Sequence, residues 1–369
     1  MKRVLHITLV AGGTGGHMMP AEAVSRELLK QGHSVSLITD RRGDSFKNIM
    51  PTLPRTVLKT GHMSSVGPIG KMQLAVNLFR SYLQCRRIMK AHRPDVVVGF
   101  GGYPSLPAVR AASSMGITTA LHEQNAVLGR SNRVLAKKCD AIALSFHNTA
   151  RMSDKEKAKA EYVGNPIRDE ISLVGTQPYS LPFKGEPFSV LVIGGSQGAR
   201  VLSQVVPTAI AALDDDARRT IKVYHQAREE DLLGVKNLYE QAGVSADVLP
   251  YFADMAKQLK LAHLVISRAG ASSVTEIAAA ARPAIFIPLP SATDDHQTAN
   301  AKSITISGGG WLMPEHDFSA EALTNKLEEL IANPSVLPSV SQNARQQANT
   351  VAASKFAELI IKVAKKELA

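Results

Sequence analysis

Two glycine-rich turns carry the clearest chemical signal in this sequence. One spans Gly12–His17 and the other spans Gly194–Ala199. Each follows a short apolar run and opens a segment with helical periodicity. Such a turn directs unpaired backbone N–H groups and the positive end of a helix dipole at one spot, which favours phosphate. The sequence therefore predicts two nucleotide-type domains that face one cleft.

Polar residues near these turns suit proton transfer and ribose binding. His17 fits a proton acceptor, and a helix N-terminal histidine with a local hydrogen bond explains it equally well. Ser267–Glu276 runs from a predicted strand through small residues into an alanine-rich helix. Ser273 and Glu276 fit a capping box there, which needs no ligand. Small residues also admit a diphosphate, Glu276 could accept both ribose hydroxyls, and Arg168 could reach the same anion.

Two further clusters follow predicted strands, at the edge where open α/β sheets bind ligands. They are Gly99–Ser105 and His122–Asn125. The second is dense in donors and acceptors, as a sugar site requires. Turn formation alone also accounts for either cluster.

Two other nucleotide chemistries fit less well. A dehydrogenase would place a ribose-binding acid near Asp40, but the glycine spacing puts Met18 where the third glycine belongs. Asp214–Asp216 and Asp294–Asp295 suggest a metal-bound nucleotide, yet the first lacks glycine context and favours a solvated turn. Helix N-termini could stabilise a leaving diphosphate, so we expect no metal.

The elements that must position these residues alternate along the chain. Apolar, β-branched runs alternate with helical-period segments, which predicts βαβ units and parallel sheets. The expected strands are Val4–Val10, Ser34–Thr39, Val96–Phe100, Thr118–His122, Ala141–Leu144, Val190–Ile193, Ile221–His225, Leu264–Ser267 and Ala284–Pro288.

The domain boundary is expected in the Gly- and Pro-rich stretch that begins at Gly164, which lacks helical period and suits a linker as far as Pro187. We predict a first domain over residues 1–163 and a second over residues 164–349. After Pro338 the pattern predicts one long helix, Val340–Leu368. Its last part, residues 350–369, is expected to pack back on the first domain.

A helical stripe between Met72 and Lys90 leaves two interpretations open. It is a core-facing helix, or it is a surface helix whose apolar face enters a lipid headgroup layer while Arg80, Arg86 and Arg87 meet acidic lipid. The apolar members of this stripe are Met72, Leu74, Ala75, Leu78, Phe79, Tyr82 and Leu83.

Bulk properties narrow the class of protein. A length of 369 residues with 44% hydrophobic residues suits two buried cores, and no apolar run reaches membrane-spanning length. The basic start imitates a signal peptide but reads better as a first strand, so we expect a cytoplasmic protein. Cys85 and Cys139 fit inert thiols. The net charge of +11 predicts an anionic partner, while 5% aromatic residues disfavour nucleic acid.

Six ordered motifs together resemble one family. The sequence resembles the bacterial glycosyltransferases of family 28 that form lipid II, collinearly from residue 4 to about residue 302. The motifs are Gly12–His17, Gly99–Tyr103, His122–Asn125, Gly164–Arg168, Gly194–Ala199, and Arg268–Ala271 with Glu276.

This resemblance implies a GT-B fold, with two Rossmann-like parallel-sheet domains and an active site between them. It implies inverting, metal-independent transfer of N-acetylglucosamine from UDP-N-acetylglucosamine to the C4 hydroxyl of the N-acetylmuramoyl unit of lipid I. No cofactor is expected. The expected location is the cytoplasmic face of the inner membrane, peripherally, with anionic inner-leaflet lipids and cell-wall synthesis proteins as partners.

The resemblance also assigns roles on the first domain. Thr14, Gly15 and Gly16 line the cleft, and the glycine-rich loops hold the acceptor diphosphate. Asn125 meets the donor sugar. His17 is the candidate base and Glu123 the second candidate.

On the second domain the resemblance implies a donor site. Ser196 and the Ala271–Glu276 stretch (Ala271, Ser272, Ser273, Val274, Thr275, Glu276) hold the UDP diphosphate, with Glu276 on the ribose. Arg168 lies near the nucleotide and Gln297 on the sugar hydroxyls. The backbone around Ala253 contacts uracil.

Two other hypotheses remain open. One is a GT-B transferase that uses a nucleotide sugar with a different acceptor, such as a glycolipid or a small aglycone. The other is a catalytically silent nucleotide-sugar-binding or membrane-scaffold protein, whose function would survive the loss of His17 or Glu276.

Overall fold

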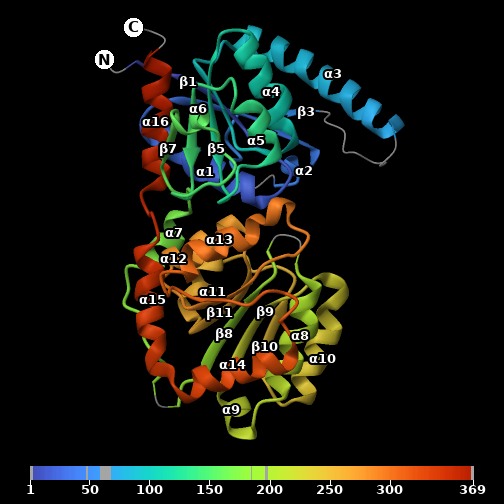
Figure 1. Ribbon diagram of the computed structural model, residues 1–369, viewed down its shortest axis with the longest axis vertical. Helices are drawn as coiled ribbons and strands as arrows, with labels where there is room; N and C mark the ends of the chain where they lie inside the picture. Colours follow the sequence, from blue (N-terminus) through green and yellow to red (C-terminus); the bar gives the residue numbers. More distant parts are fainter. Residues whose placement is uncertain (1–2, 47–48, 59–67, 184, 196–197, 367–369) are drawn as a thin grey trace. The chain divides into compact units, whose positions relative to one another are not determined.

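The computed structural model describes residues 3–46, 49–58, 68–183, 185–195 and 198–366. The chain divides into two compact units, each built around a parallel sheet (Figure 1). The first unit comprises Met1–Arg168 and Asn349–Ala369, and the second comprises Asp169–Ala348.

The first unit holds a seven-stranded sheet in the order β3-β2-β1-β4-β5-β6-β7. All neighbouring strands pair in parallel. The order reverses between β1 and β4, and such a switch point is where open α/β sheets bind ligands. The strands are β1 (His6–Val10), β2 (Ser34–Asp40), β3 (Arg55–Leu58), β4 (Val96–Gly99), β5 (Thr118–Glu123), β6 (Ala141–Leu144) and β7 (Ala160–Tyr162).

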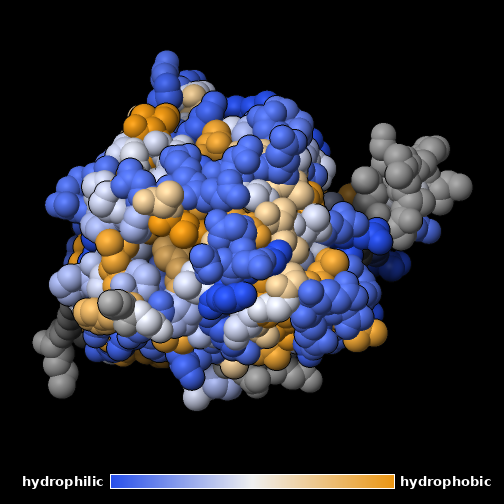
Figure 2. Space-filling model, turned by 90° about the horizontal axis from the view of Figure 1, so that it is seen from below, coloured by the Kyte–Doolittle hydropathy of each residue, from blue (hydrophilic) through white to orange (hydrophobic). Residues whose placement is uncertain are grey.

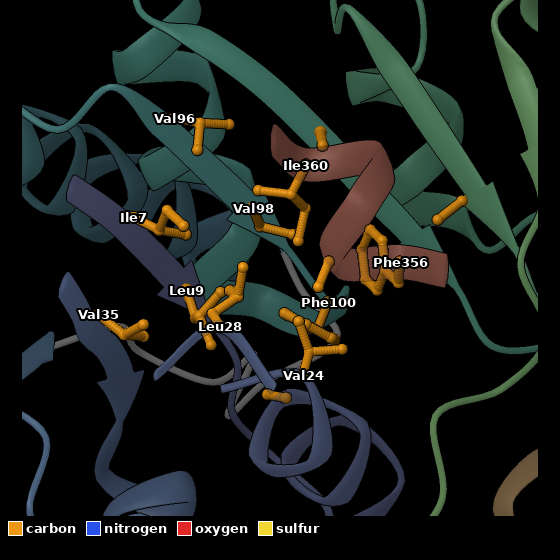
Figure 3. Packing of buried hydrophobic residues seen from close by; sticks show 14 of the residues in the cluster. Ile7, Leu9, Val24, Leu28, Val35, Val96, Val98, Phe100, Phe356 and Ile360 are labelled. Carbon is orange, nitrogen blue, oxygen red and sulfur yellow. The ribbon is translucent and has the colours of Figure 1, made fainter. Parts of the chain in front are cut away.

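Helices cover both faces of this sheet. The core on one face combines strand residues with α1 and α16, and the core on the other face combines them with α3, α4 and α5. Phe100, which follows β4, lies beside Phe356 of α16 with ring centroids 5.7 Å apart (Figure 3). The helices are α1 (Gly15–Lys30), α2 (Arg41–Asp44), α3 (Pro68–His92), α4 (Gly102–Ser114), α5 (Arg130–Leu135), α6 (Asp154–Lys157) and α16 (Ala352–Lys366).

The second unit repeats this plan with six parallel strands in the order β10-β9-β8-β11-β12-β13. Its switch point lies between β8 and β11. The strands are β8 (Phe188–Ile193), β9 (Ile221–Gln226), β10 (Ser245–Leu249), β11 (Leu264–Arg268), β12 (Ala284–Ile287) and β13 (Trp311–Leu312).

The helices of the second unit pack on both faces of its sheet. The molecular face drawn in Figure 2 is mainly hydrophilic, and its hydrophobic residues form small separate groups. The helices are α7 (Asp169–Val174), α8 (Arg200–Ala211), α9 (Asp215–Thr220), α10 (Leu232–Gln241), α11 (Met255–Leu261), α12 (Ala271–Ala279), α13 (His296–Thr305), α14 (Ala320–Ala332) and α15 (Leu337–Gln346).

The prediction of one helix over Val340–Leu368 is wrong, because the helix is interrupted between α15 and α16. Asn349 lies in the break. Its Nδ2 donates to the carbonyl of Val163 at 2.8 Å, and its Oδ1 accepts from the amide of Val351 at 3.3 Å. An Asx turn of this kind competes with the helix for backbone groups and ends it.

The sheets match the expected α/β class, and each of the nine expected strands is present within two residues of its predicted ends. Four short strands were missed, namely β3, β7, β10 and β13. The expected linker also contains a helix, α7, which buries Ile171 and Val174. The structure keeps Gly164–Arg168 with the first unit.

Candidate active site

The first glycine turn joins β1 to α1 at the switch point of the first sheet. Thr14 is the N-cap of α1 and forms no side-chain capping bond. Within the described residues, the amides of Thr14, Gly15 and Gly16 donate no hydrogen bond, as is usual in a first helical turn. These N–H groups are therefore available to an anion.

A second glycine pair lies against the first turn. Gly101 and Gly102 precede and open α4 with φ of +90° and +73°. A Cβ atom at Gly101 would lie 3.2 Å from Nε2 of His17, and one at Gly102 would lie 3.4 Å from the carbonyl oxygen of Gly12. Only glycine combines this backbone conformation with so close an approach. The structure thus brings the Gly12–His17 and Gly99–Ser105 motifs together around one imidazole.

The half-buried ring of His17 is electrostatically suited to accept a proton. Desolvation lowers its pKa, while a hydrogen bond with the Gly12 carbonyl and the negative charge of Asp40 oppose that shift. Thr14 Oγ1 lies 3.4 Å from Nδ1. A histidine with a lowered pKa is neutral at pH 7, the state that a general base requires.

Glu123, the second candidate base, is buried at the end of β5. Its Oε1 accepts from both amide groups of Asn125, at 2.9 and 3.3 Å. Its Oε2 accepts from the amide of Gly129 and from Nδ2 of Asn132, both at 2.8 Å. Burial raises the pKa of Glu123 against these four bonds. Both oxygens are thus engaged in holding the loop after β5, including Asn125.

The neighbouring His122 and Gln124 also fix this edge of the sheet. His122 is fully buried, its Nε2 lies 3.0 Å from Oγ of Ser145, and its ring stacks on Phe356. Burial lowers the pKa of His122 to about 3, so the ring is neutral. The side-chain amide of Gln124 donates to the carbonyl of Phe100. Of the His122–Asn125 motif, two members therefore support the core.

The second glycine turn follows β8, at the switch point of the second sheet. Ser196 and Gln197 lie outside the described residues. A Cβ atom at Gly194 would lie 2.5 Å from the amide nitrogen of Ala199, and one at Gly198 would lie 2.3 Å from Cγ of Arg228. Gly194 and Ala199 therefore lie in close contact just before α8.

The start of α12 lies next to this turn in the sheet, because β11 pairs with β8. Gly270 is the N-cap and Ala271 the first helical residue. The capping-box interpretation of Ser273 and Glu276 is therefore wrong, since both lie inside the helix. Oγ of Ser272 is buried without a hydrogen bond among the described residues, and such an atom marks a place for a ligand or water.

The remaining members of Ala271–Glu276 are divided between core and surface. Val274 is buried in the core, whereas Ser273 and Glu276 are half-buried. Thr275 Oγ1 donates to the carbonyl of Ala271 at 2.9 Å.

Gln297 lies close to the start of α12. Its Oε1 accepts from the amides of Ala269 and Leu289, at 3.2 and 3.0 Å, which leaves Nε2 as a donor. Asp294 and Asp295, just before α13, adopt left-handed φ values of 57° and 51°. Such backbone strain concentrates at functional sites.

The other predicted residues are less closely grouped. Ala253 is exposed after the buried Phe252. Arg168 is half-buried in the first unit. Arg268 is buried and pairs with Glu315 at 2.5 Å, so it supports the fold. Asp214 caps α9 through the amide of Ala217 at 2.7 Å.

The sequence gives Asp40 a role only in the dehydrogenase interpretation, which the glycine spacing disfavours. In the structure its buried carboxylate accepts from the amide of Gly13 at 3.0 Å. The signal was its position at the end of β2, beside the first glycine turn.

Among the described residues, no group of three or more His, Cys, Asp and Glu side chains is arranged to hold a metal ion.

The α3 helix carries an exposed apolar stripe at the edge of the first unit (Figure 1). Phe79 is 61% exposed, while Cys85 and Met89 anchor the opposite face in the core with α4. One side of the helix thus packs in the core, and another side exposes apolar side chains to solvent. No helix in the described part of the chain has both the length and the apolar character that crossing a bilayer requires. The stripe consists of Met72, Val76, Phe79 and Leu83.

Comparison with known proteins decides the family. The model of the glycosyltransferase family 28 N-terminal domain matches residues 7–144, and that of the C-terminal domain matches residues 189–360. The chain belongs to glycosyltransferase family 28. A relative from Rhodospirillum centenum, named UDP-N-acetylglucosamine--N-acetylmuramyl-(pentapeptide) pyrophosphoryl-undecaprenol N-acetylglucosamine transferase, is 43% identical over 96% of this chain and 93% of its own. A relative of the same name from Caulobacter vibrioides is 40% identical over 97% of this chain and 98% of its own.

Solved structures agree with this family 28 assignment. The crystal structure of MurG from Acinetobacter baumannii matches with a TM-score of 0.77 and 31% identity, covering 97% of this chain and 99% of that one. A UDP-GlcNAc 2-epimerase from Neisseria meningitidis matches with a TM-score of 0.69 but 10% identity, over 96% of this chain and 100% of that one, and so shares the fold alone. The GT-B fold and the family expected from the six motifs are confirmed.

Proposed function

We propose that this family 28 chain transfers N-acetylglucosamine from UDP-N-acetylglucosamine to the C4 hydroxyl of the N-acetylmuramoyl unit of lipid I, giving lipid II and UDP. The names of its relatives supply the donor and the acceptor class. The observation that carries the chemistry is the imidazole of His17, which lies against Gly101 and Gly102 and bonds the carbonyl of Gly12, beside free backbone amides.

The first unit holds the acceptor. The amides of Thr14, Gly15 and Gly16 bind its diphosphate, because they are unpaired and lie at the positive end of α1. His17 accepts the proton of the attacking hydroxyl at Nε2. Glu123 acts indirectly, by fixing the loop that carries Asn125, which contacts the donor sugar.

The second unit holds the donor. The N-terminus of α12 and the hydroxyl of Ser272 bind the UDP diphosphate, and Glu276 binds the ribose. Gln297 donates to the sugar hydroxyls through the nitrogen that its own backbone contacts leave available. Ser196 and the backbone at Ala253 complete the part of the nucleotide site that this unit supplies.

The reaction is a single displacement with inversion. The C4 oxygen forms a bond to the anomeric carbon as the bond from that carbon to the β-phosphate oxygen breaks. The hydroxyl proton passes to His17, and UDP leaves with the bonding electrons. Amide groups at the N-terminus of α12 stabilise the negative charge on the leaving diphosphate, so the reaction needs no metal.

The lipid-linked acceptor gives the α3 stripe a role. We infer that α3 binds the cytoplasmic face of the inner membrane peripherally, with Met72 and Phe79 in the headgroup layer and Arg80, Arg86 and Arg87 on acidic lipid. The exposed apolar side chains and the exposed cations lie on one helix, which supports this orientation.

The decisive experiment incubates the purified chain with labelled UDP-N-acetylglucosamine and a short-chain lipid I analogue in EDTA. We expect label in the lipid product and stoichiometric UDP. Donor binding without transfer, even after addition of Mg²⁺ or Mn²⁺, would contradict the acceptor assignment. Transfer that appears only with the metal would contradict the metal-free mechanism.

A further inference from the structure

We infer that Asp40 is a positioning residue for His17, which it holds in place through the backbone of the first glycine turn. This inference rests on the proposed role of His17 as the base. Asp40 touches neither substrate in this scheme. It acts from the end of β2.

The carboxylate of Asp40 holds the first glycine turn through backbone hydrogen bonds. Its Oδ1 accepts from the amide of Gly13 at 3.0 Å and from the amide of Gly43 at 2.7 Å. A Cβ atom at Gly12 would lie only 2.7 Å from the same oxygen. The side chain is 1% exposed. One buried oxygen thus ties the turn after β1 to the start of α2.

The first glycine turn holds the ring of His17. A ring nitrogen donates to the carbonyl of Gly12, and Nδ1 lies 3.4 Å from Oγ1 of Thr14. On the other edge of the ring, Nε2 faces Gly101. The ring nitrogen that donates to the Gly12 carbonyl carries the proton, so the other ring nitrogen keeps its lone pair to accept the substrate proton. Fixing Gly12 and Gly13 therefore fixes the tautomer as well as the ring.

The charge of Asp40 adds a second effect. Its negative charge favours the protonated imidazolium that forms when His17 accepts a proton, and it opposes the desolvation that lowers the pKa of His17. The other titratable neighbour, His122, is neutral because its pKa is about 3. On α2, Arg41 and Arg42 are exposed and Asp44 pairs with Arg55 at 3.3 Å.

The second oxygen of Asp40 argues against a purely structural role. Oδ2 is buried and forms no hydrogen bond within the described residues. A neutral asparagine could supply the same acceptor to Gly13 and Gly43 without burying a charge. Oδ1 alone makes both hydrogen bonds to the turn and to α2, so Oδ2 has no part in holding the backbone.

The test compares Asp40→Asn with Asp40→Ala. Asparagine keeps the oxygen acceptor and removes the charge, whereas alanine removes both. Asp44→Asn is the matched control, because it removes one negative charge from α2 away from the turn. For each full-length variant, the pKa of His17 is measured by ¹⁵N-histidine NMR, and kcat/KM for lipid I analogue is measured against pH.

We expect Asp40→Asn to lower the pKa of His17 by roughly 0.5 to 1 pH unit and to move the acidic limb of the kcat/KM profile down with it. The donor KM should stay within about twofold. Asp40→Ala should lower kcat by roughly 100-fold, because the ring loses its support. Asp44→Asn should change neither quantity.

An unchanged His17 pKa and acidic limb in Asp40→Asn would overturn the inference, as would an equal shift in Asp44→Asn. Failure of the proposed function gives a different result. If the chain transfers no sugar, the NMR titration still reports whether Asp40 acts on His17, because it needs no substrate.

Discussion

Glu123 binds both amide groups of Asn125 with a single carboxylate oxygen, the backbone nitrogen at 2.9 Å and Nδ2 at 3.3 Å. The other oxygen binds Gly129 and Asn132. A carboxylate that serves four donors has no lone pair directed at a substrate without first releasing one of them. We therefore propose that Glu123, the second candidate base, holds its loop in place rather than accepting the proton.

Replacing this carboxylate should destabilise the first unit. In Glu123→Gln an NH₂ group takes the place of one acceptor oxygen, so at least one buried donor loses its partner. We expect the free energy of unfolding to fall by about 1–3 kcal/mol, and donor affinity to fall because Asn125 is no longer held. Urea unfolding and UDP-N-acetylglucosamine titration measure these effects.

The matched control is Glu161→Gln, which removes an exposed carboxylate that pairs with Lys362 at 3.2 Å. An exposed pair contributes about 0–1 kcal/mol. Unchanged stability of Glu123→Gln together with a thousandfold loss of kcat would favour Glu123 as the base instead.

His17→Ala should depress turnover while leaving the donor site intact. Loss of a general base typically costs about 100- to 10,000-fold in rate. We expect kcat to fall within that range and the affinity for UDP to change less than threefold. The control is His6→Ala, an exposed histidine at the amino end of β1 whose ring lies 3.3 Å from the carbonyl of His92. Equal losses of kcat in both variants would refute the role of His17.

Glu276→Ala should act on the donor alone. Loss of a carboxylate that binds two hydroxyls removes charge-assisted hydrogen bonds worth about 1.5–3 kcal/mol, which corresponds to roughly 10- to 100-fold in Kd. Calorimetric titration with UDP-N-acetylglucosamine measures this. Glu240→Ala, on the exposed side of α10, is the control. A large fall in kcat at saturating donor, with unchanged Kd, would place Glu276 in the chemical step.

Phe79→Ser should weaken membrane binding without affecting catalysis on a soluble acceptor analogue. Phe79 is 61% exposed, and withdrawing such a side chain from an apolar layer costs about 1.5–3 kcal/mol, or at least tenfold in partition coefficient. Vesicles of phosphatidylglycerol in a sedimentation assay provide the readout. Ile306→Ser, at an 83% exposed apolar residue of the second unit, is the control. Equal binding by Phe79→Ser and the parent chain would exclude α3 as the contact.

Acid should destabilise both units through two buried histidines. Burial lowers the pKa of His122 and of His225 to about 3. An unfolded histidine titrates near pH 6.5, so the unfolded state binds more protons between pH 6.5 and pH 3, and stability falls as the pH falls. Each unit should lose roughly 2 kcal/mol between pH 7.5 and pH 5.

Urea unfolding at several pH values tests whether the free energy of unfolding falls as the pH falls. His122→Gln should flatten the pH dependence of the first unit, whatever its effect on absolute stability, because the slope reports proton uptake alone. The second unit should keep its slope in that variant, since His225 and its partner Tyr239 are unaltered. A slope near zero in the parent chain would disprove the prediction.

The parallel strands were predictable because their signal is local and strong. Buried strands such as Val96–Gly99 read as unbroken β-branched runs, and glycine turns follow two of them. The missed strands lie at or next to sheet edges, where the pattern weakens. β10 is mostly exposed and β13 has two residues, so neither leaves a recognisable apolar run.

The site was predictable in its motifs but not in its contacts. The sequence places His17 beside a glycine turn, but it does not reveal that the imidazole ring packs against Gly101. Nor does it distinguish a capping box from a helix interior, because Ser273 and Glu276 keep their spacing in both. The Asp40 contact joins residues 27 positions apart, and only the parallel pairing of β1 and β2 brings them together.

The docking of α16 has a consequence for how the chain is made. Phe356 and Ile360 belong to the core of a unit whose other members lie before Arg168 (Figure 3). On the ribosome, Asp169–Ala348 must be translated before that helix exists, which takes roughly 10 to 35 s at about 5–20 residues per second. During this interval the nascent first unit exposes an apolar face to solvent. A chain truncated before residue 352 should therefore keep this apolar face exposed and bind chaperones, rather than form a smaller folded domain.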